Sequence, residues 1–143
     1  MEYLPTALVI RTSAFFGPWD DYNFATLVLR ALARGLPFIA ASNTYISPTF
    51  IPDLVNASLD LMIDREYGIW HLANTGEVTW LDFARAAAEA AGMAPARIEG
   101  LPIEELNLAA RRPRYSVLGS ERGSLLPPLE NAIGRYSQSV SLA

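Results

Sequence analysis

The sequence predicts an α/β fold in which strands alternate with helices and form a small, mostly parallel sheet. Short apolar runs of strand length occur at residues 6–10, 37–40 and 68–73. A segment with the 3.6-residue apolar period of a helix follows each run. The chain between successive strands is long enough for the crossover connections that parallel pairing requires.

The first of these strands, "TALVI" at residues 6–10, is apolar throughout, as is typical of a strand covered on both faces. The helix after it is expected to begin near Asp20 or Asp21, either of which can cap it, and to end at Gly35. Its apolar face is formed by Phe24, Leu27, Val28, Ala31 and Leu32. A short strand, "PFIA" at residues 37–40, completes this unit.

The next segment, "SNTYISPTF", is expected to be a polar loop that leads into a helix over residues 51–63. Thr49 is the expected N-cap of that helix, and Pro52 suits its first turn because no N–H is needed there. The run "GIWHLA" at residues 68–73 predicts another buried strand, followed by a turn at "NTGE". His71 lies inside this apolar run, so we expect a packed core histidine rather than a general base.

The clearest helix pattern is "TWLDFARAAAEAAG". Thr79 and Asp82 have the spacing of a capping box, and Gly92 provides a C-terminal cap. Between them, Trp80 and Phe83 begin an apolar stripe that alanines continue. This segment is therefore expected to be an amphipathic helix with defined ends.

Residues 93–124 are rich in proline, arginine and small polar residues. We expect only a short strand near Ile98 and a helical turn near Glu104 in this segment. A last helix is expected within residues 125–136, where two consecutive prolines restrict its start.

The composition excludes several classes of protein. The 143 residues are 51% hydrophobic without an apolar run long enough to span a membrane, and the N-terminus lacks a signal-peptide pattern. We therefore expect one cytoplasmic domain over residues 1–143. Cysteine is absent and His71 is the single histidine, so no disulfide and no multi-histidine metal site is expected. The net charge of −4, without a long basic run, argues against nucleic acid as a partner.

Three segments contain candidate site residues, and each also has a purely structural explanation. In "RTSAFFGPWDDYNF", residues 11–24, Ser13 and Asn23 stand among aromatic residues that form either a pocket wall or a corner of the core. The "SPT" of residues 47–49 can bind an anion through free helix N–H groups or simply cap the helix. The "RRPRY" of residues 111–115 offers arginines for bidentate phosphate contacts or for a solvated surface.

Four stretches, "VIRTSAFFGPWDDYNF", "SPTFIPDL", "GIWHLANTGEVTWLDFARAAAEAAG" and "RRPRYSVL", together resemble the C-terminal half of the dTDP-4-dehydrorhamnose reductase family. This family of extended short-chain dehydrogenase/reductases reduces a 4-keto sugar attached to dTDP with NADPH or NADH. The resemblance extends from about Ala7 to Leu118. It implies that the chain is the C-terminal, substrate-binding portion of a Rossmann-type fold, whose last Rossmann strand corresponds to residues 7–11.

The N-terminal Rossmann half of the family carries a glycine-rich loop and a Tyr-x-x-x-Lys catalytic pair. Neither occurs here, because the closest glycines, Gly119 and Gly123, are four residues apart and all eleven cationic side chains are arginine. The resemblance therefore implies a dTDP-sugar-binding domain without catalytic residues, with NADP or NAD bound only by the full-length protein. The alternative is a non-catalytic nucleotide-sugar-binding or interaction module fused to another carbohydrate-active domain.

Carried over to this chain, the family pattern implies a set of substrate-binding residues. Arg11 and Ser13 end the strand that faces the cofactor and the sugar, and Asn23 and Phe24 open the substrate-side helix. Arg112 of the Arg-Pro element is the expected contact to the diphosphate. The complete set is Arg11, Ser13, Asn23, Phe24, Ser47, Thr49, Arg112 and Tyr115.

Two departures from the family pattern fall where the substrate is expected. Ala14 occupies the position at which the family usually has a tryptophan that packs on the sugar. Residues 43–46, "NTYI", replace the family's Asp-Gln-x-Gly. These departures leave the identity of the sugar open.

A missing Rossmann half would also affect assembly. The strand at residues 6–10 would lose the neighbour it has in the family sheet. We therefore expect an exposed apolar edge at this strand, which can pair copies of the chain into a homo-oligomer.

Overall fold

A computed structural model describes residues 4–140, in which α-helices and short strands alternate along the chain. The helices are α1 (Phe24–Ala33), α2 (Ile51–Ile63), α3 (Trp80–Ala90) and α4 (Leu129–Ser139). The strands are β1 (Leu8–Arg11), β2 (Phe15–Phe16), β3 (Phe38–Ala41), β4 (Tyr45–Ile46), β5 (Thr49–Phe50), β6 (Gly68–His71), β7 (Val78–Thr79), β8 (Ile98–Leu101) and β9 (Tyr115–Ser116). Two short 3-10 helices cover Pro95–Arg97 and Ile103–Leu106.

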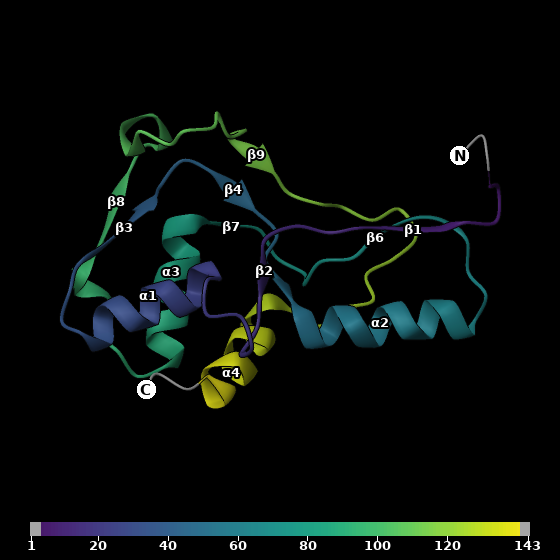
Figure 1. Cartoon of the computed structure of the whole chain (residues 1–143), viewed down its shortest axis with the longest axis horizontal. Helices are drawn as coiled ribbons and strands as arrows, with labels where there is room; N and C mark the ends of the chain where they lie inside the picture. Colours follow the sequence, from purple (N-terminus) through teal and green to yellow (C-terminus); the bar gives the residue numbers. More distant parts are fainter. Residues whose placement is uncertain (1–3, 141–143) are drawn as a thin grey trace.

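The molecule has a body and an arm (Figure 1). Helices α1, α3 and α4 form the body, and β1, β6 and α2 extend to its right in the figure. Phe16 is fully buried at the centre of the body, where its ring lies 5.1 Å from the ring of Phe83 and 5.5 Å from that of Tyr136. A second, smaller apolar cluster joins α2 to β6 through Leu61 and Trp70.

The expected α/β class with mostly parallel strands is confirmed, but the strands form four small sheets instead of one. The pairs β1–β6, β2–β5 and β3–β8 are parallel, and β4 pairs with β9 in parallel and with β7 in antiparallel orientation. The strands have only two to four residues each, so none is long enough to organise a continuous sheet. Several separate sheets result.

The segment "SNTYISPTF" is not simply the expected polar loop. It contributes β4 and β5, and its polar residues Thr44, Ser47 and Thr49 are buried. Ser47 and Thr49 engage in hydrogen bonds inside the protein, as buried polar groups normally do. Polarity therefore did not indicate exposure in this segment.

The strand β1 is covered on one face only, contrary to expectation. Leu8 and Ile10 pack against the cluster under α2, whereas Ile69, which pairs in register with Val9, is 42% exposed. The expectation was wrong because the described chain provides a helix for one face of this pair of strands and none for the other.

Helix ends follow the expected signals in part. Thr79 caps α3 by accepting a hydrogen bond from the backbone N–H of Asp82 at 3.0 Å, as predicted. In α1, however, the capping residue is Asn23 rather than Asp20 or Asp21. In α2 the N-cap is Phe50, without a side-chain hydrogen bond, and the expected cap, Thr49, lies one residue before it, where its hydroxyl is bonded to Thr12 instead.

No helix within residues 4–140 is long and apolar enough to cross a membrane.

Candidate functional site

A pocket of about 620 Å³ lies where five parts of the chain converge. These parts are the segment between β1 and β2, the strands β3 and β4, the first residues of α1 and α3, and the connection between β8 and β9. Its lining is mostly apolar with a few polar side chains, which is the usual character of a small-molecule site. Among the expected substrate-binding residues, the pocket brings together Ser13, Phe24 and Arg112.

Three other expected residues belong to the frame around this pocket. The side-chain amide of Asn23 donates to the carbonyl of Gly17 at 2.9 Å and its oxygen accepts from the N–H of Thr26. Ser47 accepts a hydrogen bond from the N–H of Leu118, and Thr49 accepts one from the hydroxyl of Thr12 at 3.1 Å. The hydrogen bonds described for Asn23, Ser47 and Thr49 are made within the protein, and the three side chains do not line the pocket.

Residues 47–49 could either bind an anion or simply cap the helix, and the helix start that they precede is engaged internally. The backbone N–H of Phe50, at the start of α2, donates to the side-chain oxygen of Asn74 at 2.7 Å. Asp53 in the first turn of the same helix adds a negative charge where an anion would approach. This end of α2 is therefore unsuited to a phosphate.

Arg11 and Tyr115 do not line the pocket. Arg11 is exposed at the end of β1, where it pairs in register with His71. Tyr115 is 59% exposed on β9, and its hydroxyl donates to Glu77 at 2.8 Å. This hydrogen bond to a carboxylate raises the pKa of Tyr115 because the phenolate could not donate it.

The pocket contains an aromatic wall that the sequence pattern did not reveal. The rings of Phe24 and Trp80 lie 4.5 Å apart, and both face the pocket. Trp80 had been assigned to the apolar stripe of its helix, and only its place as the first helical residue after the cap distinguishes it.

Ala14 lines the same pocket, in a conformation that is uncommon for alanine. Its φ of 45° lies in the left-handed region, and its carbonyl accepts a hydrogen bond from the N–H of Thr49 at 3.0 Å. Its side chain is only a methyl group, so space remains beside it in the pocket. Phe24 of α1 and Trp80 of α3 line the same pocket. The stretch at residues 11–24 is thus both core corner and pocket wall, because Phe16 is core whereas Ala14 and Phe24 line the pocket.

One side of the pocket is formed by the segment from Ile103 to Ser116, which an ionic cluster holds in place. Glu104 accepts hydrogen bonds from the side chain of Asn43 at 3.1 Å and from Arg114 at 2.6 Å. Asn43 in turn accepts from the backbone N–H of Ile103 at 2.9 Å. Hydrogen bonds from Asn43 and the backbone, followed by that from Arg114, lower the pKa of Glu104 to about 2.

This cluster predicts a specific titration. The pKa of Glu104 in the folded protein lies below its ordinary value of 4.5. The cluster therefore stabilises the folded protein fully above pH 4.5, and this stabilisation is lost as the pH falls through about 2. Carboxyl-carbon NMR should show a midpoint near 2 for Glu104. The substitution Arg114→Met should raise this midpoint toward 4.5, whereas Arg111→Met should leave it unchanged. A midpoint near 4.5 in the unmodified chain would show that the cluster does not form.

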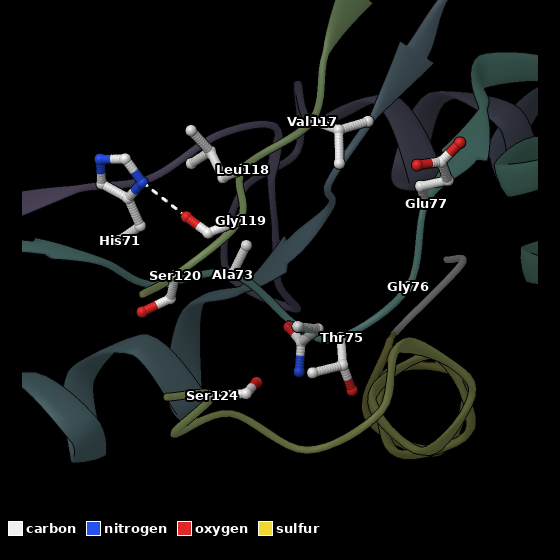
Figure 2. Close-up of a pocket in the computed structure, with 11 residues that line it drawn as sticks. His71, Ala73, Thr75, Gly76, Glu77, Val117, Leu118, Gly119, Ser120 and Ser124 are labelled. Atoms are coloured by element: carbon white, nitrogen blue, oxygen red, sulfur yellow. Dashed lines mark hydrogen bonds between the residues drawn. The ribbon is translucent and has the colours of Figure 1, made fainter. Parts of the chain in front are cut away.

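A second, smaller hollow of about 300 Å³ lies at the end of β6 (Figure 2). The Nδ1 atom of His71 lies 2.7 Å from the carbonyl oxygen of Gly119. Because a carbonyl only accepts, Nδ1 must carry the hydrogen, and the neutral ring keeps Nε2 as an acceptor. The expectation of a core histidine was wrong, because the strand ends at His71 and the ring reaches the rim of the hollow.

The described residues contain no glycine-rich turn of the kind that binds a dinucleotide in a Rossmann fold. Such a cofactor needs a glycine-rich turn between a strand and a helix. In the described chain, the connection from β2 to α1 contains one glycine, Gly17, and β5 continues directly into α2. Within residues 4–140, no group of three or more His, Asp or Glu side chains is arranged to hold a metal ion.

A comparison with family models decides the relationship. The model described as "RmlD substrate binding domain" matches residues 1–131. The chain belongs to this family. The chain is 34% identical, over 121 residues, to the dTDP-4-dehydrorhamnose reductase of Mycolicibacterium smegmatis, a match that covers 84% of this chain and 37% of the relative. It is also 34% identical to the Spore coat polysaccharide biosynthesis protein SpsK of Bacillus subtilis, with 94% of this chain and 48% of the relative covered.

Solved structures show the same fold. The crystal structure of dTDP-4-dehydrorhamnose reductase from Bacillus anthracis in complex with NADP superposes with a TM-score of 0.83 at 28% identity, over 90% of this chain and 47% of that one. The reductase from Clostridium acetobutylicum gives the same TM-score at 22% identity, over 92% of this chain and 48% of that one, which indicates the fold alone. The RmlD substrate-binding domain thus spans less than half the length of these four relatives, and its expected family and Rossmann-type fold are confirmed.

Proposed function

We propose that this chain is the substrate-binding part of a reductase that acts on a keto sugar linked to dTDP, and that residues 1–143 form one such domain without catalytic residues. The observation that carries the proposal is the pocket in which an aromatic wall faces an arginine-bearing segment. Relatives named as dTDP-4-dehydrorhamnose reductases support the choice of ligand.

The chemistry of the pocket matches a nucleoside diphosphate linked to a sugar. Phe24 and Trp80 offer flat apolar surface on which a base or a sugar ring can pack. Arg112, on the opposite segment, carries a planar guanidinium that suits bidentate contacts to phosphate. Ser13 adds a hydroxyl at the end of the β1 segment, where ligands of open α/β folds bind.

The hydride donor and the proton donor would belong to a second, Rossmann-type part. This chain has no lysine for a Tyr-x-x-x-Lys pair and no glycine-rich turn for a dinucleotide. We propose that NADP, which is bound in the relative from Bacillus anthracis, is held by that part and not by this chain.

The free edge of β1 is the proposed place of contact with such a part. Within residues 4–140, only β6 pairs with β1. Beside β6, by contrast, lies the segment around Arg122, which donates to the carbonyl of Tyr67 at 2.6 Å and lies 4.0 Å above the ring of Trp70. The unpaired edge of β1 is therefore where a further strand can pair and continue the sheet.

Calorimetry tests the proposed function. The chain should bind dTDP and dTDP-linked sugars, and NADPH should give no heat of binding. Inorganic phosphate at matched ionic strength is the control for unspecific attraction to arginine. Failure of dTDP and of every dTDP-sugar to bind would overturn the proposal.

The open edge also predicts self-association. In sedimentation velocity, the chain should form dimers or larger species at its highest soluble concentration, because unpaired strand edges recruit one another. The substitution Val9→Lys should shift the chain toward monomer, since a lysine on an edge strand opposes pairing. Leu36→Lys removes a leucine that is 53% exposed in a different region and is the matched control. A chain that is monomeric throughout would contradict the prediction.

A further inference from the structure

The side-chain hydroxyl of Thr44 is buried in the wall of the proposed site without a hydrogen-bond partner. Thr44 is only 2% exposed, and it lines the pocket that contains Arg112. Within the described part of the chain, its Oγ1 is one of two buried side-chain polar atoms that lack a partner. The neighbouring buried hydroxyls of Ser47 and Thr49 are hydrogen-bonded. The lack of a partner therefore concerns the Thr44 hydroxyl and not the whole segment.

An unpartnered buried hydroxyl is unfavourable for folding. Taking it out of water without a replacement hydrogen bond costs free energy, and native proteins leave few such groups. The cost is offset if a ligand supplies the missing partner. From the position of Thr44 in the pocket wall, we infer that its side chain turns to another staggered rotamer when the ligand binds and that its hydroxyl then makes a specificity-determining hydrogen bond to the base of the bound nucleotide. This inference rests on the proposed function.

The surroundings of Thr44 favour the base over the sugar or the phosphates. The carbonyl of Thr44 accepts a hydrogen bond from the N–H of Trp80 at 3.3 Å, so the threonine stands beside the aromatic wall. Ile46 and Ile39 are also part of the lining. A sugar ring would leave most of its hydroxyls unpaired against these side chains, whereas a base has two apolar faces and a polar edge. A hydroxyl can both donate and accept, so it can pair with a carbonyl or a ring N–H on that edge.

Arg112 sets the direction of the ligand. It belongs to the segment that forms another side of the pocket, and Pro113 restricts the backbone beside it. With the diphosphate at Arg112 and the base at Thr44, the nucleotide would span the pocket. Thr44 also falls in the stretch, residues 43–46, where the sequence departs from the family pattern.

The test compares two variants with the unmodified chain. Thr44→Val keeps the shape of the side chain but removes the hydroxyl, and Thr44→Ser keeps the hydroxyl. Thr44→Val should unfold at the same or a higher temperature, because it removes an unpartnered polar group. It should also bind dTDP about three- to tenfold more weakly, the scale of one neutral hydrogen bond. Thr44→Ser should bind dTDP more tightly than Thr44→Val.

Inorganic pyrophosphate separates contact with the base from contact with the phosphates. It has no base, so Thr44→Val and the unmodified chain should bind it equally. A clear drop in the unfolding temperature of Thr44→Val would show that the hydroxyl has a structural partner and would overturn the inference. Equal dTDP affinity in Thr44→Val, or an equal loss for pyrophosphate, would overturn it while the proposed function stands. If the unmodified chain bound neither dTDP nor any dTDP-sugar, both the inference and the proposed function would be overturned.

Discussion

Replacement of Arg135 by methionine is expected to lower the free energy of unfolding by about 2–4 kcal/mol. Arg135 on α4 holds the carboxylate of Asp53 through two hydrogen bonds of 2.7 and 2.6 Å. Asp53 is 7% exposed, so the substitution leaves a nearly buried charge with Asn74 as its remaining side-chain partner. The side chain of Arg135 is 40% exposed, so water can reach the pair and the effect falls short of a fully buried one.

Urea denaturation at neutral pH measures this effect. Arg85→Met, on the exposed face of α3, is the matched control and should change the free energy of unfolding by less than about 0.5 kcal/mol. An equally small change for Arg135→Met would show that the pair contributes nothing to stability. Since domains of this size are stable by about 5–15 kcal/mol, the expected loss is a large fraction of the total.

The same pair predicts how acid affects the protein. Burial alone raises the pKa of Asp53, but hydrogen bonds from Arg135 and Asn74 outweigh it and hold the pKa below its ordinary value of 3.8. A carboxyl group with a lowered pKa stabilises the fold above its ordinary pKa, and this contribution is lost as the pH falls through the lowered value. In Arg135→Met, the hydrogen bonds from Arg135 are lost, so burial should raise the pKa of Asp53. The pH range in which the unfolding midpoint depends on the protonation of Asp53 should therefore move to less acidic values.

Replacement of Arg112 by alanine is expected to weaken dTDP binding by about 1.5–3 kcal/mol, or about 10- to 150-fold. The reason is the loss of charge-assisted hydrogen bonds to the diphosphate, which are stronger than neutral ones. Arg112→Lys should restore only part of the affinity, because an ammonium group cannot make the bidentate contact.

Calorimetry at one fixed ionic strength checks this prediction. Arg111→Ala is the control, because Arg111 precedes Arg112 but does not line the 620 Å³ pocket. Equal affinity of Arg112→Ala and the unmodified chain would reject the assignment of Arg112. Equal losses in both alanine variants would show an effect of overall charge rather than a specific contact.

Local patterns were sufficient to locate the helices. In α3, the capping residue Thr79 and the glycine that follows the helix, Gly92 with a φ of 69°, act within a few residues of sequence. Helical hydrogen bonds also join residues that are close in sequence, so the information needed is local. The strand pairings could not be predicted in this way, because β3 pairs with β8 and β4 with β9 across long separations.

The candidate site, like the fold, could be predicted from the sequence only in part. Ser13, Phe24 and Arg112 were found from residue type and family resemblance, and the structure brings them to one pocket. Thr44 and Trp80 were missed, because one stood in a predicted polar loop and the other in a predicted apolar stripe. Neither residue type nor spacing distinguishes a side chain that faces a pocket from one that faces the core.

By itself, the sequence determined the α/β class, the positions of the helices, the family and the absence of a lysine for catalysis. Only the tertiary structure decided which polar atoms are satisfied. Ser47 and Thr44 are both buried, yet Ser47 accepts a hydrogen bond from Leu118, 71 residues further along, while the hydroxyl of Thr44 has no partner. The physical reason is that burial is decided by chain packing at long range, and a hydrogen bond requires two atoms in contact.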